Sequence, residues 1–362
     1  MHLDTVSGAT IVPVTSAAAT VVSKCIAVVS LLAAVPVTVA GQDPPRFTDK
    51  VDVARILLDV RVIDPRGRPL PGLDPAAFEV RIDGRPARVE SVQHVTGAPS
   101  VPPGPPTPTP TPGSEPQLAP PGRLVVFLFQ TSLERSRTPG LMRMLLGLRH
   151  SLDTLSPNDQ VAILRFNSRL QLLLDFTRDR ELVLRAFEHD VLFGGRTQPQ
   201  ARQVPSLLPA FDRERDTPSD SMEQSLLRIA EALTRLPGAK SVVVVGHGFG
   251  RLGSMGVLLD SDYDDAREAL QRARASVFCL DVTEADYHSL EAGLKVVAAD
   301  TGGLYQRTHI FSQAALDRVM GALEGQYVLF VEKPDLRPGS HSLEVRLKGR
   351  RGIVLAPAIY VN

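Results

Sequence analysis

The chain has 362 residues, enough for two compact domains with linkers, and its composition of 43% hydrophobic and 22% charged residues excludes an intrinsically disordered protein. Forty basic residues balance forty acidic ones, so no long-range positive field attracts nucleic acid or an anionic membrane, and we expect neither as a partner. The two cysteines, Cys25 and Cys279, provide neither a disulfide framework nor the spacing of metal ligands.

The first 40 residues have the pattern of a signal peptide. Lys24 precedes the uncharged apolar stretch Ile26–Val39, whose length suits the apolar core of such a peptide. The small residues Thr38 and Ala40 favour cleavage before Gly41. The stretch is short for a membrane span, and a retained N-terminal anchor is the alternative. We therefore predict an exported protein (periplasmic, cell-surface or secreted) whose mature chain has no membrane span.

Residues 41–97 are predicted to form a small β unit. Within them, Ile56–Asp64, Phe78–Ile82 and Ala87–Val95 tend to alternate apolar and polar side chains, and turn residues separate them. Residues 98–122 are dense in proline and include the alternating run Pro106–Pro112, which is typical of an extended spacer. We therefore expect a linker here.

Between residues 123 and 325 the pattern changes to alternating strands and helices. Uninterrupted apolar runs such as Leu124–Phe129 are typical of strands buried on both faces. The predicted elements in chain order are strand Leu124–Phe129, helix Pro139–Leu155, strand Gln160–Phe166, helices Asp179–Glu188 and Ser221–Leu236, strand Val242–Val245, helix Asp264–Ala275, strand Ser276–Asp281, helix Ser289–Ala299, strand Leu304–Gln306 and helix Gln313–Gly325. This alternation predicts an α/β fold with a doubly wound, mostly parallel sheet and helices on both faces.

Residues 326–362 return to β structure, with strand candidates at Tyr327–Glu332, Ser342–Lys348 and Ile353–Val361. Each flank alone offers about three strands, too few to bury a core. We therefore expect the C-terminal strands to complete the N-terminal β unit as one small sandwich-like domain.

Several of these segments resemble a known family. The motifs lie, in order, at residues 60–73, 78–84, 155–161, 175–180, 237–245, 300–303 and 326–330. Together they resemble the von Willebrand factor A-related (VWFA-related) proteins that acidobacteria and similar bacteria are predicted to export, over nearly all of the chain after the signal. The resemblance implies a von Willebrand factor A-like central domain and a protein-binding module rather than an enzyme.

The resemblance also implies a place for a functional site. Related domains hold a divalent cation with an Asp-x-Ser-x-Ser motif after the first strand, a threonine from a middle loop and an aspartate after a later strand. Here Gln130, Ser132 and Glu134 occupy the first motif, Thr197 is the candidate threonine, and His247 replaces the later aspartate. We therefore predict a degenerate metal-ion-dependent adhesion site, with Ser132, Glu134 and Thr197 as the remaining ligands.

All five residues are expected to form one rim that binds an unidentified protein partner. An amide and an imidazole are poor substitutes for two carboxylates around a hard cation, so no cofactor is expected, and Mg²⁺ or Mn²⁺ is the alternative. A second alternative pairs Glu134 with a protonated His247, which fills the site without a cation.

The loop 246–256 supports two enzyme alternatives. Gly248–Gly253 fits the Gly-x-Gly-x-x-Gly pattern of dinucleotide-binding proteins, although no helix clearly begins there. A hydrolase would use Ser132 or Ser254 with His247, but no orienting carboxylate is evident. Other single histidines, including His288, are interpreted as surface residues. A structural or secretory-chaperone role for the β units is a third possibility that the sequence leaves open.

Overall fold

The computed structural model describes residues 55–95, 122–132, 134, 136–195, 205–211 and 221–362. All of them belong to one compact unit, Asp52–Asn362. The predicted signal peptide, Cys25, Thr197 and nearly all of the predicted proline-rich linker lie outside the described residues. In the part of the chain that the structure describes, no helix is long and apolar enough to cross a membrane.

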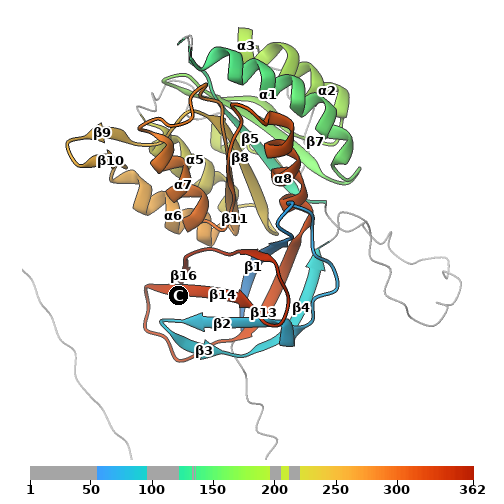
Figure 1. Cartoon of the computed structure of the whole chain (residues 1–362), viewed down its shortest axis with the longest axis vertical. Helices are drawn as coiled ribbons and strands as arrows, with labels where there is room; N and C mark the ends of the chain where they lie inside the picture. The colour runs from blue at the N-terminus through green and yellow to red at the C-terminus, as the bar shows by residue number, and fades with distance from the viewer. Residues whose placement is uncertain (1–54, 96–121, 133, 135, 196–204, 212–220) are drawn as a thin grey trace, which may run out of the picture. The chain divides into compact units, whose positions relative to one another are not determined.

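The centre of the unit is a six-stranded sheet (Figure 1). Five strands are parallel, and only the edge strand β7 is antiparallel to its neighbour. The strands, in spatial order, are β12 (Tyr305–Arg307), β11 (Ala275–Asp281), β8 (Lys240–Gly246), β5 (Leu124–Gln130), β6 (Gln160–Phe166) and β7 (Leu170–Thr177). Every residue of β5, β8 and β11 is buried, as their uninterrupted apolar runs predict.

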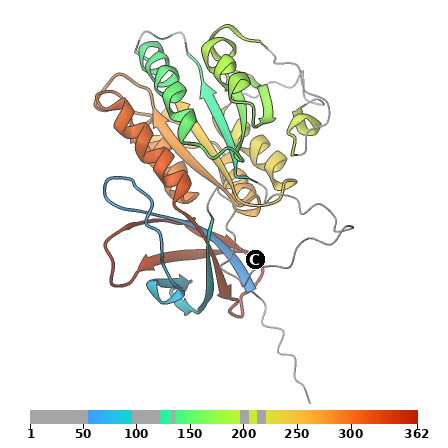
Figure 2. The same cartoon turned by 90° about the vertical axis from the view of Figure 1, so that its right-hand side faces the viewer.

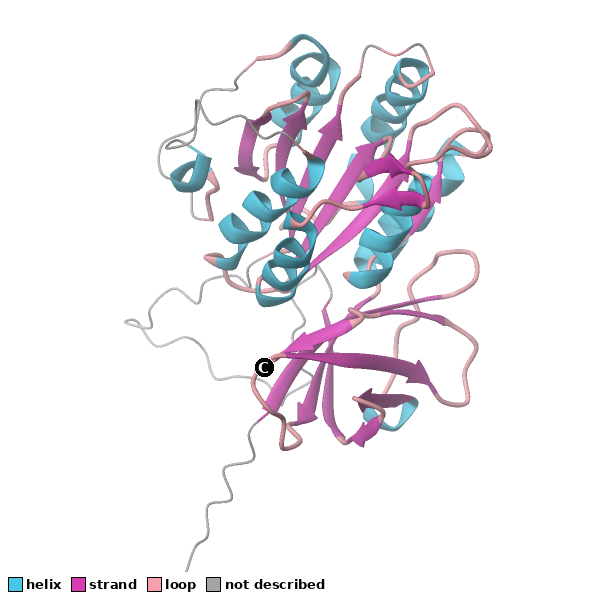
Figure 3. Ribbon diagram, turned by 90° about the vertical axis from the view of Figure 1, so that its left-hand side faces the viewer, coloured by secondary structure: helices cyan, strands magenta, loops and turns pink. Residues whose placement is uncertain are grey.

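Helices cover both faces of this sheet (Figure 3). Along β5, Val125, Phe127 and Phe129 belong to the core on one face, whereas the residues between them belong to the core on the other. The first face is covered by α1 (Thr138–Ser151), α2 (Arg180–Arg185), the π-helical turn Ala186–Asp190, α3 (Val191–Phe193) and α8 (Ser312–Glu324). The second face is covered by α4 (Leu208–Phe211), α5 (Met222–Thr234), α6 (Asp262–Arg272) and α7 (Glu291–Asp300). The predicted doubly wound α/β fold is confirmed.

The two flanks of the chain form a common β domain, and Figure 2 shows its blue N-terminal and red C-terminal strands side by side. One sheet has the order β15 (Ile353–Leu355), β1 (Arg55–Ile63), β13 (Gln326–Glu332) and β4 (Val89–Val95). The other has the order β16 (Ile359–Val361), β14 (Ser340–Leu347), β2 (Phe78–Ile82) and β3 (Arg85–Ala87). Each sheet therefore contains strands from both flanks, as the predicted sandwich-like domain requires. Both sheets contribute to one apolar core.

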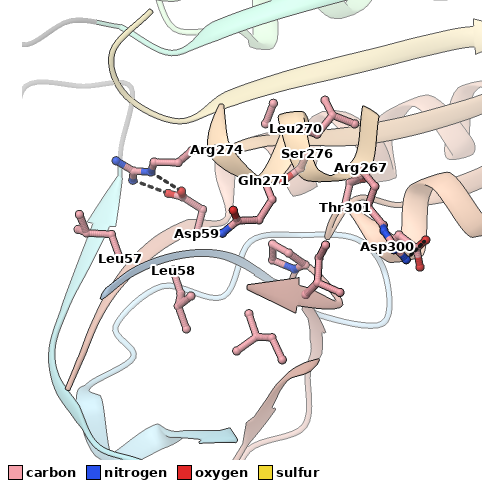
Figure 4. A pocket seen from close by; sticks show the side chains of 14 residues that line it. Leu57, Leu58, Asp59, Arg267, Leu270, Gln271, Arg274, Ser276, Asp300 and Thr301 are labelled. Carbon is pink, nitrogen blue, oxygen red and sulfur yellow. Dashed lines mark hydrogen bonds and ion pairs between the residues drawn. The ribbon is translucent and has the colours of Figure 1, made fainter. Parts of the chain in front are cut away.

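Polar contacts join strand β1 to the beginning of the central strands, around a small cavity of about 30 Å³ (Figure 4). Asp59 accepts two hydrogen bonds from Arg274, with Nε–Oδ2 and Nη2–Oδ1 distances of 2.7 and 2.8 Å. Arg61 is 1% exposed and donates to the hydroxyls of Ser276 and Ser241 at 2.6 and 2.8 Å. Burial lowers the pKa of Arg61 to about 10. These paired groups connect the β domain to the central domain.

The Asp-Thr-Gly-Gly motif at residues 300–303 has a structural role at the same junction. The carbonyl oxygen of Asp300 accepts a hydrogen bond from the backbone N–H of Ala358 at 2.9 Å. Gly302 has a φ of +71°, and a Cβ atom there would lie 2.6 Å from the carbonyl carbon of Ala356. The motif therefore allows the C-terminal segment to approach the central domain closely.

Two elements differ from the sequence-based expectation. Strand β7 was not predicted; it follows a tight turn in which Ser168 has a φ of +73°. The loop after β8 contains a hairpin of β9 (Arg251–Gly253) and β10 (Gly256–Leu258), and no helix begins before Asp262 in this part of the chain, which the structure describes throughout.

Candidate functional site

Three central strands end next to one another at the carboxyl edge of the sheet. Strand β5 ends at Gln130, β8 at Gly246 and β11 at Asp281, and β8 lies between the other two. Loops at such an edge are where ligands gather in open α/β sheets. The predicted rim residues Gln130, Ser132, Glu134 and His247 belong to the first two of these strand ends.

The side chain of Gln130 is committed to the backbone of the neighbouring loop. Its Oε1 atom accepts hydrogen bonds from the N–H groups of His247 and Gly248, at 2.8 and 3.1 Å. A Cβ atom at Gly246 would lie 2.7 Å from the same oxygen, so a larger residue there would shift the amide from this position. Gln130 and His247 are therefore neighbours, as predicted. The contact between them is a hydrogen bond from the His247 backbone to the Gln130 side chain, and it holds the loop in place.

The imidazole of His247 is held in its neutral form. The residue is 7% exposed, and its Nδ1 atom has no hydrogen-bond partner among the described residues. Burial, with a smaller contribution from the nearby Arg137 and His288, lowers the pKa of His247 to about 3. The alternative in which Glu134 holds a protonated His247 is therefore wrong, because the Glu134 carboxylate is paired with Arg137 and the buried imidazole has a lowered pKa.

Glu134 and Ser132 form a separate local arrangement before helix α1. The Glu134 carboxylate lies 3.0 Å from Nε of Arg137. The backbone N–H of Glu134 donates a hydrogen bond to Oγ of Ser132 at 3.2 Å. The side chain of Glu134 is 58% exposed, so this ion pair is surrounded by water. Thr197, the third predicted ligand, lies outside the described residues.

The donor set in the described residues does not fit a hard cation. Gln130 is neutral and already accepts two hydrogen bonds, Glu134 is paired with Arg137, and His247 supplies a neutral nitrogen. Mg²⁺ requires about six oxygen donors in octahedral geometry. Across the described ranges, no group of three His, Cys, Asp or Glu residues is placed to hold a metal ion.

The end of β11 carries a polar network that sequence reasoning missed. Asp281 is 2% exposed and accepts hydrogen bonds from Nε2 of His288 at 2.7 Å and from the hydroxyl of Tyr305 at 2.9 Å. Burial and the negative charge of Asp281 raise the pKa of Tyr305. The interpretation of His288 as a surface residue is therefore wrong, since its side chain is 17% exposed and fixed by a buried carboxylate.

The glycine pattern at residues 248–253 builds a hairpin. A Cβ atom at Gly248 would lie 2.3 Å from Cβ of Leu290, and Gly250 has a φ of +82°. Ser254 lies in the turn between β9 and β10. Among the described residues, no hydrogen bond links His247 to Ser132 or Ser254, the pairs that the hydrolase alternative would use.

No family model and no curated protein sequence matches the chain. Among solved structures, BatB from Bacteroides thetaiotaomicron is 15% identical, with 55% of this chain and 97% of that chain covered and a TM-score of 0.38. A von Willebrand factor type A protein from Catenulispora acidiphila is 10% identical, with 85% and 73% covered and a TM-score of 0.39. Proximal thread matrix protein 1 from the mussel byssus, described with a zinc-occupied metal-ion-dependent adhesion site, is 12% identical, with 59% and 48% covered and a TM-score of 0.39.

These structural similarities do not identify a function. The fold is instead described by the order and direction of the six strands in the central sheet. Five parallel strands, one antiparallel edge strand and helices on both faces agree with the fold that the sequence motifs imply. The central domain therefore has the sheet architecture that the resemblance of its sequence motifs to von Willebrand factor A-like domains implies.

Proposed function

We propose that this protein is an exported, non-enzymatic module that binds a protein partner at the carboxyl edge of its central sheet without a metal ion. Its binding surface is the carboxyl rim, defined as the loops that carry Gln130, Ser132, Glu134 and His247, in which Ser132 and Glu134 supply accessible side chains and the buried Gln130 and His247 hold the loops in place. Its place at the strand ends supports this proposal, because loops that converge there are free to vary while the sheet stays fixed.

The observation that carries the proposal is the double hydrogen bond to Oε1 of Gln130. An aspartate at this position would offer a charged oxygen to a cation, whereas the amide oxygen is used to hold the loop after β8. Since the only carboxylate of the rim in the described residues is paired with Arg137, a cation would have to displace existing contacts at both positions. This arrangement supports recognition without a metal.

Isothermal titration of the full chain with MgCl₂ and MnCl₂ tests the metal-free proposal. We expect no binding heat with either ion, and the same flat trace for Glu134→Ala. Saturable heat that disappears in Glu134→Ala would instead identify a working metal site and overturn this part of the proposal.

A non-enzymatic role and export are tested separately. With p-nitrophenyl acetate, we expect hydrolysis at the buffer rate, unchanged in Ser132→Ala and His247→Gln; turnover that either variant abolishes would favour a hydrolase. For export, we expect the mature protein outside the cytoplasm with Gly41 as its first residue. A cytoplasmic protein that retains Met1 would contradict export.

A further inference from the structure

The hairpin after strand β8 projects from the central domain (Figure 1). Its strands β9 and β10 pair only with each other, from Gly253↔Gly256 to Arg251↔Leu258. A two-stranded hairpin of this length has little stability of its own in water. We call residues 251–258 the hairpin wedge.

The base of the hairpin wedge is firmly attached to the domain. Phe249 is 1% exposed and belongs to the core under the second face of the sheet. A Cβ atom at Gly293 of helix α7 would lie 2.3 Å from the carbonyl oxygen of Phe249, so the two backbones are in close contact. The carboxylate of Glu223 on α5 accepts a hydrogen bond from the backbone N–H of Gly250. The wedge is therefore held in a defined position by two helices.

The hairpin wedge exposes apolar side chains on both of its faces and at its tip. Met255 at the turn is 94% exposed, Leu252 is 67% exposed and Leu258 is 50% exposed. Leu252 pairs with Val257 and lies on one face, whereas Leu258 lies on the opposite face with the paired Arg251. A flat partner surface would cover only one face of the wedge and leave the apolar side chain on the other face in water. A cleft would cover the apolar side chains on both faces.

Acidic residues follow the wedge along the chain. Asp260 follows it, and Asp262, Asp264 and Asp265 form the first turn of α6. Two arginines compensate part of this charge, with distances of 3.7 Å between Arg251 and Asp260 and 3.1 Å between Arg267 and Asp264. Four carboxylates and two guanidinium groups leave this region negative. It therefore favours a cationic partner and disfavours an anionic lipid surface.

We propose that the hairpin wedge inserts into an apolar cleft of a protein partner whose borders carry Lys or Arg side chains. The proposal rests on the proposed function of the protein as a binding module and names the chemistry of its partner. Apolar contact with both faces of the wedge supplies affinity, and pairing with the Asp260–Asp265 region supplies orientation. It also gives a role to the glycine-rich loop, whose glycines shape the hairpin.

Site-specific photocrosslinking of the full chain in its own cells tests this proposal. A benzophenone amino acid is placed at Met255, with a matched placement at Leu146, which is 61% exposed on α1. We expect a discrete adduct with another protein from position 255 and none from 146. Its yield should fall at least about fivefold in Leu252→Ser, and equally in Asp264→Lys combined with Asp265→Lys, because apolar contact and charge both contribute. Unchanged thermal unfolding of the variants shows that they remain folded.

Four results would overturn the wedge proposal. They are the absence of an adduct at 255, an adduct whose yield the charge reversal leaves unchanged, an adduct with a second copy of this chain, and wedge-dependent sedimentation with phosphatidylglycerol vesicles. A third placement at Ser132 separates this proposal from the proposed function. An adduct at Ser132 without one at 255 supports the rim and refutes the wedge. The charge-sensitive adduct at 255 without one at Ser132 does the opposite, and no adduct at either position refutes both.

Discussion

The neutral state of His247 predicts a specific loss of stability in acid. The unfolded chain exposes this imidazole to water, where its pKa is about 6.5. In the folded protein, burial lowers the pKa to about 3. Between these two values the unfolded state binds a proton that the folded state does not bind. The free energy of unfolding therefore falls as the pH decreases from about 6.5 to about 3.

The size of this effect follows from the two pKa values. Each unit of difference corresponds to about 1.4 kcal/mol, so the full contribution approaches about 5 kcal/mol at pH 3. Between about pH 7.5 and pH 5, the same relation gives a loss of about 2 kcal/mol. His247→Gln removes the titrating group, and its free energy of unfolding should lack this part of the pH dependence.

Urea denaturation of the wild type and of His247→Gln at about pH 7.5 and pH 5 measures this difference. His341→Gln provides a control of opposite sign, because the hydrogen bond to Asp83 raises the pKa of His341 and its protonated form stabilises the fold in acid. Equal pH dependence in the wild type and His247→Gln would refute the reasoning. If His247 instead made the wild type more stable than His247→Gln at pH 5, the result would support an ion pair between Glu134 and a protonated His247. The NMR titration of the His247 ring gives the same pKa directly.

Three further predictions concern structural contacts, each measured as the free energy of unfolding in urea. Gln130→Ala should lose about 2–3 kcal/mol, because two buried N–H groups lose their acceptor; a change within about 0.5 kcal/mol would contradict the role of the amide. Asp59→Asn should lose about 3 kcal/mol, because Arg274 keeps a charge without its carboxylate; wild-type stability would show that water replaces the pair. Gly302→Ala should cost at least about 2 kcal/mol more than Gly72→Ala, which also has a positive φ but nothing within 4 Å of an added Cβ atom; equal losses would show that the close approach is unimportant.

The parts of the fold that could be predicted are those that local pattern defines. Strand β5 is apolar throughout, and helix α2 begins after Asp179, whose side chain accepts hydrogen bonds from the N–H groups of Glu181 and Leu182. Strand β7 was missed because its side chains are buried unevenly and it follows β6 after only a short turn. The hairpin β9–β10 was missed because its strands have three residues each and its glycines suggested a phosphate loop.

The candidate site was less predictable because its contacts depend on groups that sequence patterns do not pair. The bond between the Gln130 side chain and the His247 backbone links an amide to an N–H group 117 positions later. The network around Asp281 joins side chains from the end of β11, from the loop before α7 and from β12, and the residue types alone do not reveal it. The residue types alone predicted a degenerate cation site. What the side chains of that site can do depends on their burial and on their hydrogen-bond and ion-pair partners, which the sequence does not show.

The place of strand β13 has a consequence for biosynthesis. This strand lies between β1 and β4, so the N-terminal strands lack their central neighbour until Gln326–Glu332 has been synthesised. A single residue separates the end of helix α8 from the start of β13, and the folded central domain thus brings this strand close to β1. When the central domain folds first, it brings the N-terminal and C-terminal strands of the β domain close together and so lowers the entropy cost of pairing them. The β domain should therefore form last during translation, and a ribosome stalled before β13 leaves β1, β2 and β4 without their C-terminal neighbours, so that their edges are open to aggregation.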